Sequence, residues 1–334
     1  GVYKTIDGGA SWEGVMEADE HTGATDLVMD PRDPDVLYAA AHQRRRHVFT
    51  LVGGGPGSAI YKSRDGGETW EKLDKGLPST VMGRIGLVLS PADADVVYAI
   101  IEASEGEEGF YRSLNRGASW KKMSDYVTSG NYYQEIVADP KDVDRVYSMN
   151  TWMHVTEDGG KTWNRAGEKN KHVDNHALWI DPEDTDFLLA GCDGGIYESF
   201  DGSKTWNFKS NLPVTQFYKV AVDDDRPFYN VYGGTQDNYS LGGPSRTTSS
   251  AGIVNADWFV TLGGDGFETQ VDPDNSDIVY SQWQYGNLTR YDKASGEKHD
   301  IKPRAREGED AYRWNWDAPL QVSQHFSGRL YFAA

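Results

Sequence analysis

The stretch "SRDGGETW" at residues 63–70 places a serine, an aspartate, two glycines, a threonine and a tryptophan within eight positions. Four near-copies keep the same order: "TIDGGASW" (5–12), "SLNRGASW" (113–120), "TEDGGKTW" (156–163) and "SFDGSKTW" (199–206). Their tryptophans recur every 43 to 58 residues, a period typical of propeller blades with four strands each. The stretch is therefore one copy of a repeated β unit.

Two further patterns recur along the chain, seven times each. The first is a short apolar run ended by an acid or a serine, such as "DLVMDP" (26–31) and "ETQVDP" (268–273). The second is a β-branched and aromatic run, such as "VVYAII" (96–101) and "IVYSQW" (278–283). No segment has sustained helical periodicity. The sequence predicts an all-β fold, a β-propeller of seven four-stranded blades with the quoted motif between third and fourth strands.

The two ends of the chain bear on how such a ring would close. Residues 1–16 read as third and fourth strands, and residues 318–334 read as first and second strands. We expect one domain, 1–334, in which these segments complete the seventh blade and remove a free edge. The alternative is a piece cut from a longer multi-propeller chain, because Gly1 opens inside a motif without an initiator Met or a signal peptide.

The motif itself has a structural explanation. Glycines adopt positive φ angles, the aspartate accepts hydrogen bonds from the turn, and the tryptophan packs on the neighbouring sheet. Acids spread around a rim do not converge on one substrate, and one copy has Asn in place of the acid. We therefore assign a structural role to the acid or amide and the tryptophan of each copy: Asp7, Trp12, Asp65, Trp70, Asn115, Trp120, Asp158, Trp163, Asp201 and Trp206.

Composition excludes several classes of function. The formal net charge of −19 disfavours binding to nucleic acid or to an anionic membrane. The single cysteine, Cys192, excludes an internal disulfide and a cysteine-based zinc site. No apolar run approaches the roughly 20 residues of a membrane helix, so direct membrane insertion is not expected.

The repeated motif resembles the Asp-box (BNR-repeat) β-propeller superfamily, which includes sialidases, xyloglucanases and sortilin-type receptors. The chain is most similar to large secreted or periplasmic bacterial BNR-repeat proteins labelled glycosyl hydrolases. The stretches that carry this resemblance are distributed along the chain between residues 22 and 273: "TGATDLVMDPRDPDVLYAA" (22–40), "HQRRRHVFTLVGGGPGSAIYKS" (42–63), "HVDNHALWIDP" (172–182), "LPVTQFYKVAVD" (212–223), "YGGTQDN" (232–238), "GIVNADWF" (252–259) and "GGDGFETQVDP" (263–273).

The resemblance implies a propeller, an extracytoplasmic location and a carbohydrate or protein ligand, but the activity does not follow from the motif. The arginine triad and the Tyr/Glu pair of sialidases are not assignable here. The xyloglucanase signature of aspartate, isoleucine and two glycines is absent. Those xyloglucanases also place one catalytic Asp on each of two propellers, so a second propeller of a longer chain is a candidate partner.

In a propeller, the loops that enter the innermost strands converge at the mouth of the central channel. These loops carry a mixture of aromatic, amide and charged side chains, which suits a sugar that stacks one ring face and hydrogen-bonds at its edge. Loops between second and third strands add His42, Gln43 and further polar groups. The ligand-binding candidates are Arg84, Tyr132, Tyr133, Gln134, His172, His176, Gln216, Tyr218, Gln236, Asn238, Arg313, Asn315 and Trp316.

Glycoside hydrolysis requires two carboxyl groups about 5–9.5 Å apart. Among the acids of the converging loops we rank Asp174 and Asp265 first, and Asp26 and Asp237 next. The competing interpretation is that aspartates beside glycines cap turns, as in "GGDGF" and "TQDN".

"HVDNH" has the spacing most typical of a metal site in the chain. On an extended segment His172, Asp174 and His176 share one face and could hold a divalent cation, Ca²⁺ or Zn²⁺. A hydrogen-bonded histidine pair without metal is the favoured alternative, and no cofactor is required.

Three charged runs receive a structural interpretation. "HQRRRH" (42–47) either binds an anionic group or, as we favour, pairs with nearby acids as a solvated loop. "DDD" (223–225) and "DPDNSD" (272–277) are acid-rich turns rather than calcium loops.

Together these observations predict a propeller that binds, and in one version hydrolyses, a carbohydrate at the channel mouth. The alternative is a non-catalytic propeller that binds a peptide or protein, as sortilin-type receptors do. Two carboxyl groups at catalytic separation in an accessible pocket would distinguish the enzyme from the binding module.

Overall fold

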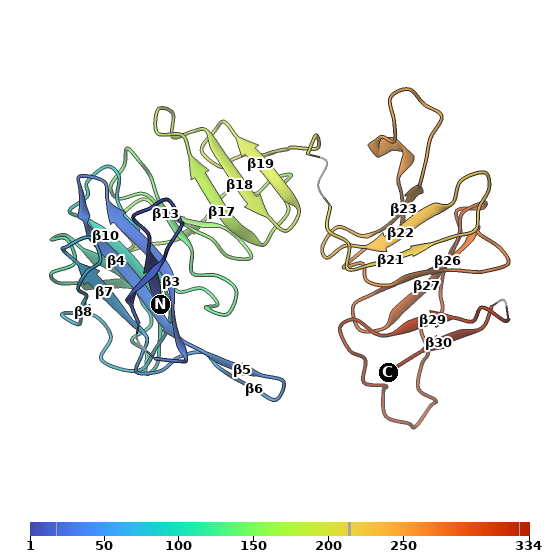
Figure 1. Ribbon diagram of the computed structural model, residues 1–334, viewed down its shortest axis with the longest axis horizontal. Coiled ribbons are helices and arrows are strands. Elements are labelled where there is room, and N and C mark those ends of the chain that lie inside the picture. Colours follow the sequence, from blue (N-terminus) through green and yellow to red (C-terminus); the bar gives the residue numbers. More distant parts are fainter. Residues whose placement is uncertain (18, 213–214, 327) are drawn as a thin grey trace. The chain divides into compact units, whose positions relative to one another are not determined.

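The computed structural model describes residues 1–17, 19–212, 215–326 and 328–334 (Figure 1). Pro213 and Val214, within the quoted stretch 212–223, and Ser327, within the predicted closing segment, lie outside the described residues. The chain folds as two compact units, Gly1–Ser210 and Asn211–Ala334. Among the described residues, no helix has the length and apolar character needed to span a membrane.

Four four-stranded antiparallel sheets build most of the first unit, and each follows chain order from the first strand to the fourth. Their strands are β3 (Thr22–Asp30), β4 (Asp33–Gln43), β7 (Ala59–Ser63) and β8 (Glu71–Leu73); β9 (Met82–Leu89), β10 (Val97–Ala103), β11 (Gly109–Ser113) and β12 (Lys121–Ser124); β13 (Ile136–Ala138), β14 (Val146–Ser148), β15 (His154–Thr156) and β16 (Asn164–Arg165); β17 (Asn175–Ile180), β18 (Leu188–Cys192), β19 (Gly195–Ser199) and β20 (Asn207–Phe208).

Two smaller sheets complete the first unit. They are the pair β1 (Val2–Lys4) and β2 (Glu13–Met16), and the hairpin β5 (Arg45–His47) and β6 (Thr50–Val52). The hairpin is inserted between the second and third strands of the first four-stranded sheet and projects away from it (Figure 1).

The second unit continues the same pattern. Its elements are β21 (Lys219–Val222), β22 (Asn230–Gly234), β23 (Ser240–Pro244), the 3₁₀ helix η1 (Asn255–Asp257) and β24 (Phe259–Leu262); β25 (Thr269–Val271), β26 (Ile278–Trp283), β27 (Asn287–Asp292) and β28 (Lys298–Asp300); and the pair β29 (Leu320–Val322) and β30 (Leu330–Phe332). The all-β prediction is confirmed, with sheets that follow the strand order of propeller blades.

The described residues thus form six four-stranded sheets, together with β1–β2 and β29–β30 as two-stranded sheets. The strand assignments at both ends agree with the sequence. Because β1–β2 belong to the first unit and β29–β30 to the second, the count of seven blades and the ring closure of 1–16 with 318–334 stay predictions.

Apolar residues fill the spaces between successive sheets. One cluster joins the first and second sheets through Tyr38, Ile60 and Ile101, and the next joins the second and third through Tyr98, Phe110 and Ile136. Because the apolar runs quoted above supply these positions, burial of the central strands accounts for the order in which the sheets stack.

In four copies the repeated motif is the turn between the third and fourth strands of its sheet, as predicted, and the copy at 5–12 joins the two strands of the β1–β2 sheet. In the copy at 63–70, Asp65 Oδ1 accepts the backbone N–H of Thr69 at 2.9 Å, and Asp65 Oδ2 accepts the Thr69 hydroxyl at 2.5 Å. Ser63 Oγ accepts the N–H of Gly67 at 2.8 Å, where φ is +91°. In the copy at 113–120 the Asn115 amide makes the matching bonds to Ser119, at 2.9 Å.

The tryptophans of the motif differ in burial. Trp120 and Trp206 are buried, and Trp163 stacks on Tyr126 with ring centroids 4.2 Å apart. Trp12, in contrast, is 63% exposed. The tryptophans of the later copies therefore pack as predicted, whereas Trp12 of the copy at 5–12 does not.

The turn geometry gives a testable pH dependence. Hydrogen bonds, first from the Thr69 hydroxyl, lower the pKa of Asp65 from 3.8 to about 2. A lowered folded pKa adds stability at neutral pH that is lost as the pH falls from about 4 through 2. Calorimetry of Asp65→Ala should show a melting temperature lower by about 2–4 °C at pH 7. Asp65→Asn should keep most of the stability, because Asn115 serves in a natural copy.

The difference between wild type and Asp65→Asn should narrow as the pH approaches 2, since only the wild-type side chain titrates. Equal losses in the Ala and Asn variants at pH 7 would contradict the hydrogen-bonding role of this position.

Candidate functional site

Five predicted site residues of the first unit lie within the first strands of their sheets or just before them. Asp26 is within β3, Arg84 within β9, and His176 within β17. Tyr133 lies in the segment before β13, and Asp174 immediately precedes β17. The structure thus brings together five of the side chains that the sequence places in converging loops.

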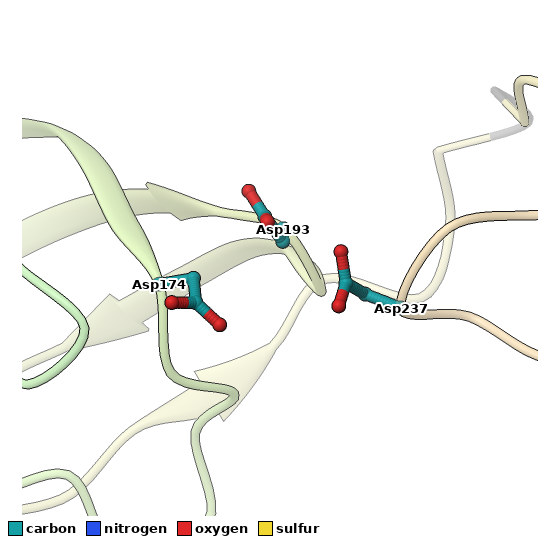
Figure 2. Close-up of side chains that lie close together, drawn as sticks. All are labelled: Asp174, Asp193 and Asp237. Atoms are coloured by element: carbon teal, nitrogen blue, oxygen red, sulfur yellow. The ribbon is translucent and has the colours of Figure 1, made fainter. Parts of the chain in front are cut away.

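Two carboxylates form the centre of this group, and we call Asp174 and Asp193 the acid pair. A carboxylate oxygen of each lies within 4.8 Å of the other. Figure 2 shows Asp174 just before β17 and Asp193 on the turn after β18. The backbone N–H of Asp193 donates to the Asp174 carbonyl at 3.2 Å, which links the two turns. Asp237, also drawn in Figure 2, belongs to the second unit.

The Asp174 backbone has φ +62°, a left-handed conformation that non-glycine residues seldom adopt and that concentrates at functional sites. Its N–H donates to the Thr151 carbonyl at 2.9 Å. The conformation is therefore held by a hydrogen bond from the preceding sheet.

An aromatic ring and an imidazole hold the acid pair from one side. The Tyr133 hydroxyl donates to Asp174 Oδ1 at 2.6 Å. Burial, followed by this contact with Asp174, raises the Tyr133 pKa to about 12, so the phenol stays protonated and remains a donor at neutral pH. The Tyr133 and His176 rings stack with centroids 5.4 Å apart, and His176 Nε2 lies 3.0 Å from Asp193 Oδ1.

His176 also lines a cavity of about 290 Å³ that contains the charged residues Asp26, Arg84 and Glu135, and we call these four residues the acid cleft. Arg84 pairs with the Glu135 carboxylate. Asp26 Oδ2 accepts the N–H of Leu87 at 2.8 Å and so ties β3 to β9. Burial raises the Asp26 pKa above its ordinary value, because a desolvated carboxyl group is disfavoured in its charged form.

Three other candidates of the first unit have their polar groups taken up by the protein. Gln134 is buried, with Nε2 donating to the Arg84 carbonyl at 3.1 Å and Oε1 accepting from Thr128. His42 Nε2 lies 3.1 Å from the Gly53 carbonyl, and Gln43 Oε1 accepts the Gly57 N–H at 2.9 Å. Tyr132, by contrast, is 66% exposed and close to Tyr133.

The proposed metal ligands do not gather as the spacing predicts. His172 turns its Nδ1 to the Val173 carbonyl at 2.9 Å, and His176 contacts Asp193 instead. Among the described residues, the atoms of His172, Asp174 and His176 do not meet the spacing that a shared cation would need. Metal content stays a prediction, and the first unit offers carboxylates rather than a histidine cage.

The second unit contains its own pair of acids. Asp265 Oδ1 accepts the N–H of Asp237 at 3.0 Å, and the Asp265 N–H donates to Gln284 Oε1 at 3.3 Å. Burial raises the Asp265 pKa, and the neighbouring Asp237 charge adds to the shift. Asp265 belongs to this unit and Asp174 to the first, so their ranking as a catalytic pair stays a prediction.

The second unit also contains the remaining predicted site residues. The Tyr218 hydroxyl contacts Gln236 Oε1, and Asn238 Nδ2 donates to the Gln236 carbonyl at 3.1 Å. Phe267 lies between Tyr218 and Trp316, with ring centroids at 5.3 and 6.5 Å. Gln216, Arg313 and Asn315 are exposed.

The basic run "HQRRRH" does not pair with acids as we expected. Arg44 Nη2 donates to Asn131 Oδ1 at 3.2 Å, and Arg45 contacts the His21 ring. Among the described residues, no salt bridge joins Arg44, Arg45 or Arg46 to a carboxylate. The 27 residues from Val36 to Lys62 contain no Asp or Glu, so this segment itself offers the arginines no carboxylate.

Sequence reasoning missed Asp193 and Glu135. Asp193 lies between the second and third strands of its sheet, the position that gave His42, Gln43 and Gln236 in other sheets. Its glycine-rich surroundings, "GCDGG" (191–195), were a usable signal. Glu135 directly follows Gln134, and the predicted loop residues ended at Gln134.

Comparison with known proteins gives two kinds of similarity. A family model described as Sortilin-Vps10, "Sortilin, neurotensin receptor 3", matches residues 1–144. A xyloglucanase of a Paenibacillus species is 26% identical over 217 residues, which cover 63% of this chain and 18% of that protein. A xyloglucanase of Acetivibrio thermocellus is 24% identical over 256 residues, which cover 73% of this chain and 27% of that protein.

Among solved structures, the GH74 xyloglucanase from Xanthomonas campestris aligns with 94% of this chain and 51% of its own, at 18% identity and a TM-score of 0.47. YCF48 from Cyanidioschyzon merolae aligns with 93% of this chain and 92% of its own, at 13% identity and a TM-score of 0.38. The chain thus spans about a fifth to a quarter of the two sequence relatives and about half of the first structure.

Proposed function

Because the chain belongs to the Asp-box (BNR-repeat) β-propeller superfamily, we propose that its first unit binds a carbohydrate at the acid cleft and hydrolyses it with the acid pair. The observation that carries this proposal is the approach of Asp174 and Asp193 to within 4.8 Å. Retaining glycosidases hold their two carboxyl groups about 5–5.5 Å apart, whereas inverting enzymes need about 6.5–9.5 Å. The geometry therefore favours retention of configuration.

The surroundings divide the roles of the two acids. Asp174 is oriented by the Tyr133 hydroxyl and is the proposed nucleophile, because a fixed carboxylate attacks with less loss of freedom. Asp193, whose Oδ1 lies 3.0 Å from His176 Nε2, is the proposed acid and base, since the second carboxyl group takes this role when the first is the nucleophile.

The acid cleft supplies binding groups next to this pair. The Arg84 guanidinium can donate hydrogen bonds to sugar hydroxyls, and the Glu135 carboxylate beside it can accept them. The exposed Tyr132 offers an aromatic face for stacking. Sugars are bound by such combinations of stacked rings and edge hydrogen bonds. Xyloglucanase relatives support a polysaccharide with a β-glucan backbone as the ligand class, and an extracytoplasmic location follows from that ligand.

Binding is tested by calorimetric titration of the 334-residue chain with xyloglucan oligosaccharides, cello-oligosaccharides and a mannan. We expect binding of a β-glucan, and a loss of about tenfold in affinity in His176→Ala, because truncating a stacked contact ring costs more than about 1 kcal/mol. The matched control is His299→Ala, an exposed histidine of the second unit. Equal affinity in His176→Ala and wild type would place the ligand elsewhere, and no glycan binding would overturn the proposal.

A second candidate function is supported by the family model that matches residues 1–144. That model describes a receptor, and most of the first unit lies within its range. A propeller that binds a peptide or protein without catalysis would leave the acid pair as ligand contacts. Glycan binding without turnover, or peptide binding without glycan binding, would favour this function.

A further inference from the structure

A second cavity of the first unit, of about 460 Å³, lies beside the acid cleft. We call its residues His21, Thr22, Arg44, Arg84, Gly130 and Asn131 the arginine cleft. Thr22 begins β3, Arg44 follows β4, and Arg84 lies in β9. Three segments far apart in the sequence therefore converge on this cavity.

Among the residues that the structure describes, Arg44 lines this cleft without an ion pair to a carboxylate. The Arg84 guanidinium is paired with Glu135, and Glu20, at the rim, lies 2.9 Å from the His21 ring. Arg44 instead contacts the neutral Asn131 amide. Its planar guanidinium has five N–H donors, one of which this contact uses. The remaining donors suit a carboxylate, which arginine binds in a bidentate geometry.

The charge of the whole chain makes this arrangement unusual. With a net charge of −19 and 52 acidic residues, carboxylates are abundant elsewhere on the surface. The segment from Val36 to Lys62 nevertheless contains none and carries three consecutive arginines. A local positive potential in an acidic protein attracts an anionic group to one place and repels it from the others.

The two clefts adjoin, because Thr25 and Arg84 line both cavities. A ligand chain with sugars in the acid cleft can therefore reach Arg44 with a neighbouring residue. We propose that the arginine cleft binds a carboxylate of that ligand, so that the substrate class is an acidic, uronate-containing polysaccharide. This inference rests on the proposed carbohydrate function and adds the charge of the substrate to it.

The test compares oligosaccharides with the same backbone and different charge. Cello-oligosaccharides and their C6-oxidised, uronate-containing counterparts are titrated into the 334-residue chain at low and at moderate salt, with inorganic phosphate as a third probe. We expect the wild type to bind the oxidised form about tenfold more tightly than the neutral form, and the difference to shrink as salt increases.

Arg44→Gln is expected to remove that tenfold preference and to leave binding of the neutral form unchanged. Arg44→Lys should keep part of it, because lysine retains the charge without the fork of donors. The matched control is Arg46→Gln, which changes the net charge equally two residues away and should retain the preference within about twofold. Thermal unfolding of each variant checks that the exposed side chain has been replaced without loss of the fold.

The outcomes separate the two proposals. Equal affinity of the wild type for both forms overturns the acidic substrate class and leaves the carbohydrate function standing. If Arg44→Gln and Arg46→Gln reduce the preference for the oxidised form equally, Arg44 does not contact the carboxylate. The preference would then come from the overall positive charge of the arginine run. Phosphate that binds as tightly as the oxidised form identifies a free anion instead of a sugar carboxylate, and binding of neither sugar form overturns both proposals.

Discussion

Replacing Asp174 or Asp193 by asparagine is expected to lower the rate of β-glucan hydrolysis about 100- to 10,000-fold, with little change in binding. Each substitution keeps the shape of the side chain and removes the carboxyl group that attacks or transfers a proton. The two acids lie within 4.8 Å of each other, so both variants should fail at the chemical step. Reducing-sugar release at saturating substrate measures the rate, and calorimetric titration measures binding.

The control is Asp125→Asn. Asp125 is an acid of the same unit whose side chain is 91% exposed and pairs with Lys122, so this variant should hydrolyse at the wild-type rate. The anomeric configuration of the first product, followed by NMR, should be retained. Inversion would contradict the short separation of the acid pair, and undiminished turnover in both Asn variants would assign the chemistry to other residues.

The turns were predictable from sequence because they are local. In 63–70, the hydrogen bonds of Asp65 reach Thr69, four residues away, so a short motif contains the interactions that form it. The strand order follows in the same way, since each apolar run pairs with the next run along the chain. The closure of a ring depends instead on the two ends of the sequence, which no local pattern specifies.

The site was only partly predictable because its contacts are not local. Asp174, Tyr133 and His176 were named from the convergence of loops, but the partner of His176 is Asp193, on a different turn. The alternation that placed His172 and His176 on one face assumes extended backbone. At Asp174, φ is +62°, which turns the chain and separates the two histidines into different surroundings.

The contact of Arg44 could not be predicted from the sequence either. A basic run in an acidic protein normally finds carboxylate partners, and on that basis we expected ion pairs. Arg44, however, contacts Asn131, on the loop between β12 and β13. Which neutral or charged group meets a side chain across a cavity is set by the register of several sheets, and composition does not determine it.

Lys171→Met is expected to destabilise the first unit by about 3–5 kcal/mol, because it removes the buried cation nearest the Glu168 carboxylate. The half-exposed Arg165, 3.8 Å from Glu168 Oε2, would then be left as the partner of that buried charge. The Lys171 side chain is 0% exposed and lies 3.0 Å from Glu168 Oε1, whose side chain is 3% exposed. Lys171 Nζ also donates to the His172 carbonyl at 2.9 Å and contacts Asn175. It therefore holds the segment that leads to Asp174.

Urea unfolding followed by tryptophan fluorescence measures the effect, since Trp206 lies 5.5 Å from the lysine nitrogen. The matched control is Lys204→Met, at an exposed position of the neighbouring turn, which should stay within about 0.5 kcal/mol of wild type. Adding Glu168→Gln to Lys171→Met should recover part of the loss, because the amide removes the stranded charge. If Lys171→Met lowers the free energy of unfolding no more than Lys204→Met does, water replaces the lysine nitrogen. Asp174 would then be held in place by the Tyr133 hydroxyl and the Thr151 carbonyl.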